Sequence, residues 1–358
     1  MPTEDHPKTG DASVPAKPKR RVRYRGANPR RFEEKYKEHN PERYPEDVQK
    51  ILDRGKTPAG SHRPICVAEI LEVLALKPGE TAVDATLGHG GHALEIARAI
   101  LPDGRLIGLD ADPLELPRAE ERLRATGIPT EALLLRRSNF AGLPQVLAEA
   151  AIDGADAILA DLGVSSMQID DPARGFSFKH DGPLDMRMNP QRGRPASEFL
   201  AVLPEEKLAA LLSNNADEPY AQLIAAAMVR AGREMPIART ARLSEVVREA
   251  VLHGHHPASE AEASVRRVFQ ALRIAVNDEF GALEMFLRNL PGCLKPGGRV
   301  AILTFHSGED RRVKKAFQAG ERDGFYSGIA GEVIRASAAE VRANPRAASA
   351  KLRWAVRV

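Results

Sequence analysis

The sequence predicts an α/β fold with a mostly parallel sheet, and three observations support that prediction. Strand and helix patterns alternate between residues 81 and 161, which implies right-handed crossovers between parallel strands. A glycine-rich turn at residues 85–91 separates the first strand from the helix that follows it. A strand pattern returns at residues 298–305, after a long stretch in which only helices are expected. We therefore expect one sheet domain that a helical insertion divides in the sequence.

The first half of the sheet is predicted from short apolar runs that alternate with amphipathic helical patterns. The first helix ends at the stop signal Lys77-Pro78-Gly79, because proline and glycine do not continue a helix. The expected strands are residues 81–84, 105–110, 131–135 and 156–161, and the expected helices are residues 67–76, 92–100, 113–125 and 143–151.

The alternation stops after Asp161. Residues 166–190 are interpreted as a long polar loop. Further helices are expected at residues 197–200, 205–212, 221–230, 243–252 and 276–290. The last residues, 352–358, alternate apolar and polar side chains and predict a final strand.

The amino-terminal residues 1–60 are rich in Pro, Lys, Arg and Glu and are interpreted as an extension. The formal net charge is only +3, but positive residues gather at 17–31, with Tyr24 and Phe32 among them. Such a segment can neutralise phosphates and stack on bases; a solvated tail is the alternative. The expected domains are the extension, a sheet domain of residues 61–168 and 268–358, and residues 169–267 as a loop with a helical insertion.

The composition is that of an ordinary globular protein, with 43% hydrophobic and 28% charged residues. There is no apolar run long enough to cross a bilayer, and the amino terminus lacks a signal-peptide pattern. Cys66 and Cys293 cannot form a disulfide framework and lack metal-ligand spacing. We expect a cytoplasmic protein without a metal site.

The glycine turn and the acid that ends the next strand predict a cofactor site. Gly88, Gly90 and Gly91 allow a tight turn and close approach of a ligand to the amino terminus of a helix. Asp110 is suited to bind ribose hydroxyls. The ligand should carry adenosine; the pattern G-x-G-x-x-G is absent, which disfavours NAD without excluding it. A plain glycine turn of an α/β domain is the alternative.

Two further residues follow strands at the same edge of the sheet. Asp161 ends the fourth strand and faces the same crevice as Asp84 and Asp110, or else caps the following turn. His306 follows the strand of residues 298–305. It is a candidate catalytic residue, but the pattern is equally explained by a structural turn in which Ser307 and Asp310 cap a helix.

Nothing in the sequence indicates covalent catalysis. The patterns G-x-S-x-G and H-E-x-x-H and the phosphate-binding loop are absent. Neither Cys66 nor Cys293 follows a proline, as the nucleophile of cytosine-C5 methyltransferases usually does.

Several segments together resemble one family, the bacterial small-subunit ribosomal RNA cytosine-N4 methyltransferases, from about His62 to the end of the chain. The resemblance implies a Rossmann-like class I S-adenosylmethionine-dependent methyltransferase domain with an inserted all-helical domain. The segments are His62-Arg-Pro-Ile, Asp84-Ala-Thr-Leu-Gly-His-Gly-Gly-His92, Leu109-Asp-Ala-Asp-Pro113, Ser138-Asn-Phe140, Asp161-Leu-Gly-Val-Ser-Ser-Met-Gln-Ile-Asp170, Arg174-Gly-Phe-Ser-Phe178, Asp181-Gly-Pro-Leu-Asp-Met-Arg-Met188, Phe269-Gln-Ala-Leu-Arg-Ile274, Thr304-Phe-His-Ser307 and Asn344-Pro-Arg346.

The same resemblance implies the cofactor, the substrate and the residues that bind them. The cofactor is S-adenosylmethionine, and the partner is the 30S ribosomal subunit with its 16S rRNA, in which a cytidine of the decoding centre is methylated. A homodimer is left open. The implied cofactor-binding residues are Gly90, Gly91, His92, Asp110, Phe140, Asp161 and Gln168.

The chemistry suggests roles for a second group of residues. A cytosine amine is a poor nucleophile, so the enzyme must orient it and accept charge as it reacts. We expect Asp161 to lie near the amine and Phe176 or Phe178 to stack on the extruded base, although these rings could instead pack within the loop. The candidate RNA-binding residues are Arg174, Phe176, Phe178, Asp185 and Arg187.

The sequence departs from the family pattern in a few places, and other functions stay open. Residues 256–269 are longer and more acidic than usual, and Gly308 stands where the family usually has leucine. The alternatives are methylation of another RNA or of a protein, a nicotinamide-dependent oxidoreductase, and a non-catalytic RNA-binding assembly factor.

Overall fold

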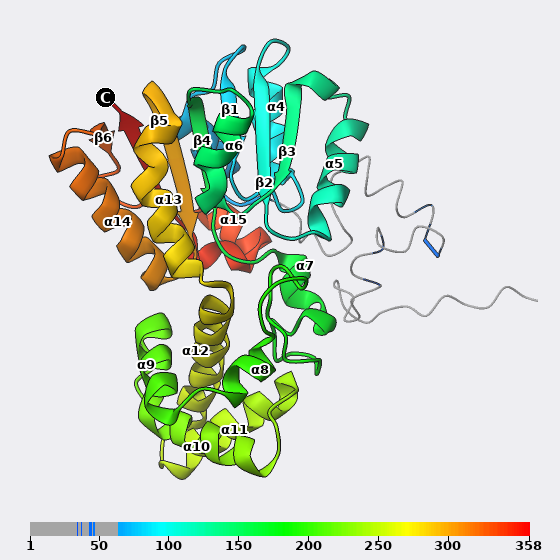
Figure 1. The fold of residues 1–358 in the computed structure, drawn as a ribbon, viewed down its shortest axis with the longest axis vertical. Coiled ribbons are helices and arrows are strands. Elements are labelled where there is room, and N and C mark those ends of the chain that lie inside the picture. Colours follow the sequence, from blue (N-terminus) through cyan, green and yellow to red (C-terminus); the bar gives the residue numbers. More distant parts are fainter. Residues whose placement is uncertain (1–33, 35–36, 38–42, 45, 47–63) are drawn as a thin grey trace, which may run out of the picture.

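The computed structural model describes residues 34, 37, 43, 44, 46 and 64–358. The basic segment 17–31, most of the predicted extension 1–60 and His62 lie outside the described residues. In Figure 1 a sheet with helices packed against it lies above a separate group of helices. No helix in the described part is long and apolar enough to span a membrane.

The elements follow the chain in three stretches. The first comprises α3 (Val67–Leu74), β1 (Thr81–Asp84), α4 (Gly91–Ile100), β2 (Arg105–Asp110), α5 (Glu115–Ala125), β3 (Leu133–Arg137), α6 (Leu143–Glu149) and β4 (Ala155–Asp161). The second comprises α7 (Ser166–Asp170), α8 (Ala196–Ala201), α9 (Glu205–Ala216), α10 (Ala221–Glu234), α11 (Thr240–His253) and α12 (Ala258–Asn277). The third comprises α13 (Glu279–Cys293), β5 (Leu294–Thr304), α14 (Ser307–Arg322), β6 (Tyr326–Ile329), α15 (Ala338–Ala343) and β7 (Lys351–Arg357).

The sheet confirms the predicted fold class. Its strand order is β3-β2-β1-β4-β5-β7-β6, and the five strands from β3 to β5 are paired in parallel. β7 pairs antiparallel with both β5 and β6. The short strand β6 was not predicted, because its sequence Tyr-Ser-Gly-Ile offers little apolar alternation.

Alternating side chains of the strands form two cores, one on each face of the sheet. Ile158 and Ala160 of β4 pack on one side with α6, α13 and α14. Ala157 and Leu159 of the same strand pack on the other side with α3, α4 and α5. This alternation is the period of two that an extended strand imposes, and each fully buried large apolar side chain contributes roughly 1.5–3 kcal/mol.

A third core lies within the helices α8 to α12, which come between β4 and β5 in the sequence. The long helix α12 was not predicted as one element: the sequence suggested a domain boundary at residue 268 and a helix from residue 276. α12 instead runs to Asn277 and ends where Asp278 adopts a left-handed conformation with φ of 49°. α12 extends toward the sheet in Figure 1 and thus joins the two groups of elements.

Candidate active site

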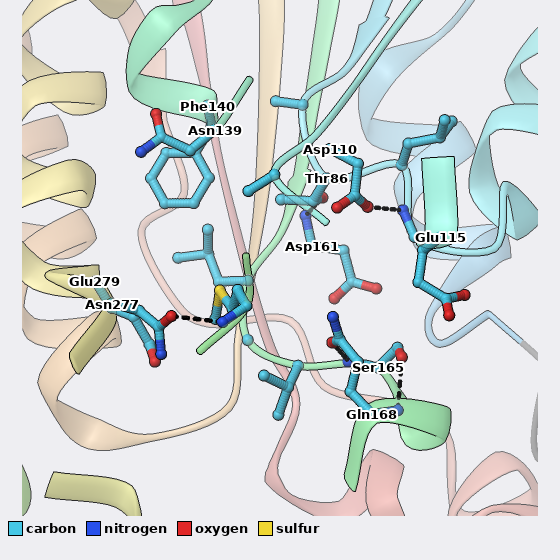
Figure 2. A pocket seen from close by; sticks show the side chains of 18 of the residues that line it. Thr86, Asp110, Glu115, Asn139, Phe140, Asp161, Ser165, Gln168, Asn277 and Glu279 are labelled. Carbon is cyan, nitrogen blue, oxygen red and sulfur yellow. Dashed lines mark hydrogen bonds between the residues drawn. The ribbon is translucent and has the colours of Figure 1, made fainter. Parts of the chain in front are cut away.

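The candidate site lies where the strand order of the sheet reverses. β1 pairs with β2 on one side and with β4 on the other, so the connections that leave their carboxyl ends diverge and open a crevice. A cavity of about 1020 Å³ occupies this edge. In Figure 2, Asp161 lies between Asp110 and Glu115 on one side and Phe140 and Asn139 on the other.

The turn after β1 has the close-packed form that the glycines predict. Gly88 and Gly90 have φ values of +48° and +76°, which side-chain-bearing residues rarely adopt. A Cβ atom on Gly90 would lie 3.3 Å from Leu123, and one on Gly91 would lie 3.2 Å from Pro64. Gly91 and His92 line the cavity, whereas Gly90, also predicted to bind the cofactor, does not.

Asp110 is held at the end of β2 by two backbone groups. The Gly88 N–H donates to Oδ2 and the Asp112 N–H donates to Oδ1, each at 2.7 Å. Burial raises the pKa of Asp110 to about 6, although these hydrogen bonds oppose the shift. The carboxylate lines the cavity next to the glycine turn, as predicted for a ribose-binding acid.

A buried carboxylate, Asp112, connects this loop to the segment after β4. Its Oδ2 accepts hydrogen bonds from Gln168 Nε2 and Arg174 Nη1, both at 2.8 Å. Arg174 also donates to the carbonyls of Arg187 and Met188. Arg174, which we expected to bind RNA, therefore directs its guanidinium into the protein and does not line the cavity.

Gln168 lines the cavity, but its amide is already engaged. It forms a capping box with Ser165: the Ser165 N–H donates to Gln168 Oε1 at 2.9 Å, and the Gln168 N–H donates to Ser165 Oγ at 3.2 Å. With its Nε2 directed at Asp112, the side chain shapes the wall of the predicted cofactor site.

Asp161 ends β4 at the centre of the cavity. Its N–H donates to Thr86 Oγ1 at 2.6 Å, which fixes the strand end against the glycine turn. Burial, reinforced by the negative charge of Glu309, raises the pKa of Asp161 to about 7. Among the described residues its Oδ1 atom is buried and has no hydrogen-bond partner. Such an orphaned carboxylate oxygen is costly unless a ligand supplies a partner.

His92 stands beside this carboxylate. Its Nε2 contacts the Ile65 carbonyl at 2.9 Å, and because a carbonyl only accepts, Nε2 carries the proton. Nδ1 faces Asp161 Oδ2 at 3.6 Å. Burial lowers the pKa of His92, so the ring stays neutral and places no positive charge beside Asp161.

His306 lines the opposite wall and caps α14. Its Nδ1 accepts the Glu309 N–H at 3.4 Å, and its Nε2 lies 3.2 Å from Glu309 Oε1. The predicted cap by Ser307 and Asp310 is wrong, because Asp310 turns away to pair with Arg353 at 2.7 Å. The imidazole ring has taken the place of a hydroxyl cap.

Two acids of this wall, Glu309 and Glu279, were missed by the sequence analysis. Glu309 accepts the Phe305 N–H at 2.9 Å, and contact with His306 together with the charge of Arg273 lowers its pKa despite burial. Arg273 donates to both oxygens of Glu279 at 2.8 Å. Glu309 follows His306 by three residues, which reads as an ordinary helix start, and the Arg273–Glu279 pair spans the turn at Asp278 that the sequence did not reveal.

The aromatic candidates separate into two groups. Phe140 lines the cavity and packs edge-on against Phe286, with ring centroids 5.4 Å apart. Phe176 is buried in the core of the helical group, and Phe178 packs against Phe269 at 5.3 Å. Neither Phe176 nor Phe178 lines the cavity, so both rings have the loop-packing role that was the alternative.

Arg187 lines the cavity, and Asp185 holds it in place. Arg187 donates through Nε to Oδ1 at 2.8 Å and through Nη2 to Oδ2 at 2.7 Å. This bidentate pair lowers the pKa of Asp185. Asp185 itself does not line the cavity, so it acts on any ligand through Arg187.

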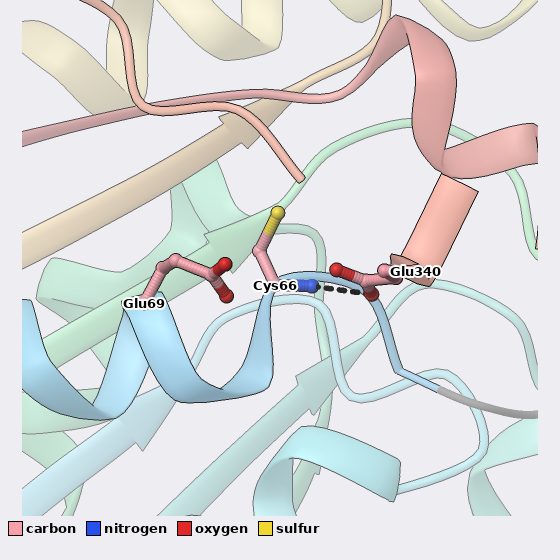
Figure 3. A group of neighbouring side chains, drawn as sticks. All are labelled: Cys66, Glu69 and Glu340. Carbon is pink, nitrogen blue, oxygen red and sulfur yellow. Dashed lines mark hydrogen bonds between the residues drawn. The ribbon is translucent and has the colours of Figure 1, made fainter. Parts of the chain in front are cut away.

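Two groups of described side chains bring three candidate metal-ligand atoms together. One is Glu279, His306 and Glu309, in which Arg273 already occupies both oxygens of Glu279. The other, shown in Figure 3, is Cys66, Glu69 and Glu340. There the Glu340 carboxylate accepts the Cys66 N–H at 2.9 Å, and burial raises the thiol pKa of Cys66 to about 12. This contact ties α15 to the start of α3.

Comparison with known proteins agrees with these features. A model of the MraW methylase family matches residues 59–358. The "Ribosomal RNA small subunit methyltransferase H 1" of Lachnoclostridium phytofermentans is 48% identical over 346 residues, which cover 95% of this chain and 93% of that protein. The "Ribosomal RNA small subunit methyltransferase H 2" of Alkaliphilus metalliredigens is 48% identical over 344 residues, which cover 95% of this chain and 98% of that protein.

A solved structure of an S-adenosylmethionine-dependent O-methyltransferase from Thermotoga maritima aligns with 87% of this chain and 71% of that one, at 11% identity and a TM-score of 0.39. This similarity is too distant to assign a role to any residue of the site. The family match and the two relatives confirm the resemblance read from the motifs. The chain belongs to the MraW methylase family and is a methyltransferase that uses S-adenosylmethionine.

Proposed function

We propose that this enzyme methylates the exocyclic N4 amine of a decoding-centre cytidine in the 16S rRNA of the small ribosomal subunit. Two relatives that align over nearly the whole chain carry the name of small-subunit rRNA methyltransferases. The observation that carries the proposal is Asp161, a partly buried carboxylate whose Oδ1 atom is buried without a hydrogen-bond partner among the described residues, between the glycine turn and the far wall of the cavity.

The residues present fit the cofactor. S-adenosylmethionine carries a net positive charge, and the raised pKa values of Asp110 and Asp161 mark carboxylates that a cation would stabilise in their ionised form. Gly91 and His92 would hold the methionine part by backbone contact, Asp110 the ribose hydroxyls, and Phe140 the adenine ring. When bound, the cofactor supplies a methyl group activated by its sulfonium.

The chain's own residues would orient the amine and accept its proton. A cytosine amine has its lone pair delocalised into the ring, so a carboxylate that accepts an N–H hydrogen bond increases its electron density as the N–C bond forms. Asp161 Oδ1 is the atom with a free acceptor site. The proton lost from the amine passes to this carboxylate.

His92 and Glu309 would act through Asp161. The Nδ1 lone pair of His92 faces Oδ2 and gives a protonated Asp161 a place to direct its proton. The negative charge of Glu309 raises the proton affinity of Asp161. Both are positioning residues, because neither needs to touch the amine for this effect.

The test is transfer of labelled methyl groups to small subunits from a strain that lacks the modification. Nuclease digestion then identifies the labelled nucleoside. We expect N4-methylcytidine from the decoding centre. Labelling of another RNA, or of a ribosomal protein, would keep the enzyme class and reject the proposed acceptor.

A further inference from the structure

Three arginines at the mouth of the cavity have no acidic partner among the residues that the structure describes. Arg136 and Arg137 end β3, and Arg192 lies in the loop between α7 and α8. All three line the cavity and are exposed. Within the described part of the chain, none forms an ion pair: Arg136 donates to the neighbouring Leu135 carbonyl at 3.1 Å, and Arg137 to Gln191 Oε1 at 3.3 Å. We call these three the mouth arginines.

Other arginines of the same cavity behave differently. Arg187 pairs with Asp185, Arg273 with Glu279 and Arg346 with Asp170, at distances of 2.7 to 2.9 Å. The mouth arginines therefore do not follow the local pattern. Unpaired guanidinium groups gathered from two distant segments form a positive rim that is available to an anion.

The cofactor does not account for this rim. S-adenosylmethionine has no phosphate, and its positive charge suits the acidic floor formed by Asp110 and Asp161. Its one anionic group, the carboxylate, belongs to the methionine part, which the proposed function places at Gly91 and His92. The rim is therefore left for the anionic groups of a second ligand. Guanidinium groups bind phosphate oxygens through paired N–H donors and are well suited to that role.

We propose that the mouth arginines bind the backbone phosphates that flank the target nucleotide of the RNA; this inference rests on the proposed function. When a base enters a pocket, its own phosphates stay outside at the entrance. Arg136 and Arg137 on the sheet and Arg192 on the loop line that entrance from separate segments of the chain. They position the strand and carry no sequence information.

The test compares two sets of variants in the full chain. The triple variant R136Q/R137Q/R192Q removes the rim charges. The control R230Q/R233Q removes two exposed arginines of α10 that line no part of the cavity and form no ion pair in the described chain. The measurements are the Kd of protein-free 16S rRNA as a function of salt, the KM for small subunits, and the Kd of S-adenosylmethionine.

Each phosphate contact contributes about 0.7 to 0.9 to the slope of log K against log salt. The triple variant should flatten that slope by about 2 to 3 and weaken rRNA binding at least about tenfold at low salt. The control should leave both unchanged, and both variants should bind S-adenosylmethionine like the parent.

Three results would overturn the inference and leave the proposed function standing. An unchanged salt slope means that the mouth arginines do not contact phosphates. A loss of cofactor affinity equal to the loss of RNA affinity assigns them to the cofactor. A defect with small subunits that is absent with protein-free rRNA assigns them to a ribosomal protein. If the parent enzyme methylates no small-subunit rRNA, the proposed function fails and the inference fails with it.

Discussion

At the scale of single residues, the charge of Glu309 affects the pKa of Asp161. Asp161 has the higher pKa, raised to about 7 by burial and by the charge of Glu309. The contact with His306 and the charge of Arg273 lower the pKa of Glu309, which keeps it ionised. Asp161 must be ionised to accept a proton, so the active fraction grows as the pH rises through this value.

We therefore predict that kcat/KM rises with pH on a limb centred near 7 in the parent enzyme. The substitution E309Q removes the negative charge that raises the pKa of Asp161, so the limb should move to lower pH. Glutamine still offers an oxygen to the Phe305 N–H. The matched control is E321Q, an exposed position of the same helix, which should leave the limb in place; an unmoved limb in E309Q would contradict the account.

At the scale of elements, the start of α14 shows how a departure from the family pattern is accommodated. Gly308 stands where the resemblance led us to expect leucine, and the ring of Phe280 from α13 occupies the adjacent space. Arg312 stacks over that ring, 3.5 Å from its centroid. The glycine thus allows α13 and α14 to approach closely beside His306.

Gly308→Leu should destabilise the protein by about 1–3 kcal/mol, because a Cβ there would lie 2.7 Å from Phe280 Cζ. Adding Phe280→Ala makes room, so the double variant should lose less than the sum of the single effects. Urea unfolding measures the free energy of unfolding of the two single variants and of the double variant. Gly232→Leu in α10, where nothing lies within 4 Å of the added atom, is the control and should be neutral or slightly stabilising. If the effects of Gly308→Leu and Phe280→Ala simply add in the double variant, Gly308 does not pack against Phe280 as described.

The ion pair of Asp112 with Arg174 joins two loops. Their side chains are 1% and 11% exposed, so R174Q leaves a buried charge poorly compensated and should cost about 3 kcal/mol. The exposed pair of Arg239 with Asp181, 58% and 42% exposed, supplies the control: R239Q should cost far less stability than R174Q. Thermal or urea unfolding measures the loss of stability in each variant. Equal losses would mean that Asp112 is not effectively buried.

At the scale of the whole molecule, the sequence predicts the sheet better than the way its parts meet. The strands at residues 81–84 and 105–110 were predicted with the bounds that the structure has, because buried parallel strands between helices leave a strong local pattern. The candidate site residues Asp110 and Asp161 could be placed at strand ends that line the cavity for the same reason.

The contacts that complete the site depend on distant partners and left no such signal. Arg174 is conspicuous as a charged residue in a polar loop, yet its guanidinium is fixed by Asp112 and two carbonyls. Phe176 was expected from the sequence to stack on a base, but its ring is buried in the core of the helical group. Periodicity shows which face a side chain occupies within its own element, and it does not show which other element covers that face.

The central claim is that Asp161 accepts the amine proton in a cavity that also holds the cofactor. Single-turnover methyl transfer to small subunits by the parent and by D161N, with the Kd of S-adenosylmethionine measured separately, tests it most directly. Asparagine keeps the size of the side chain and removes the basic oxygen, so transfer should slow by about 10² to 10⁴. Cofactor affinity should change far less. Full-rate transfer by D161N with an unchanged cofactor Kd would contradict the claim.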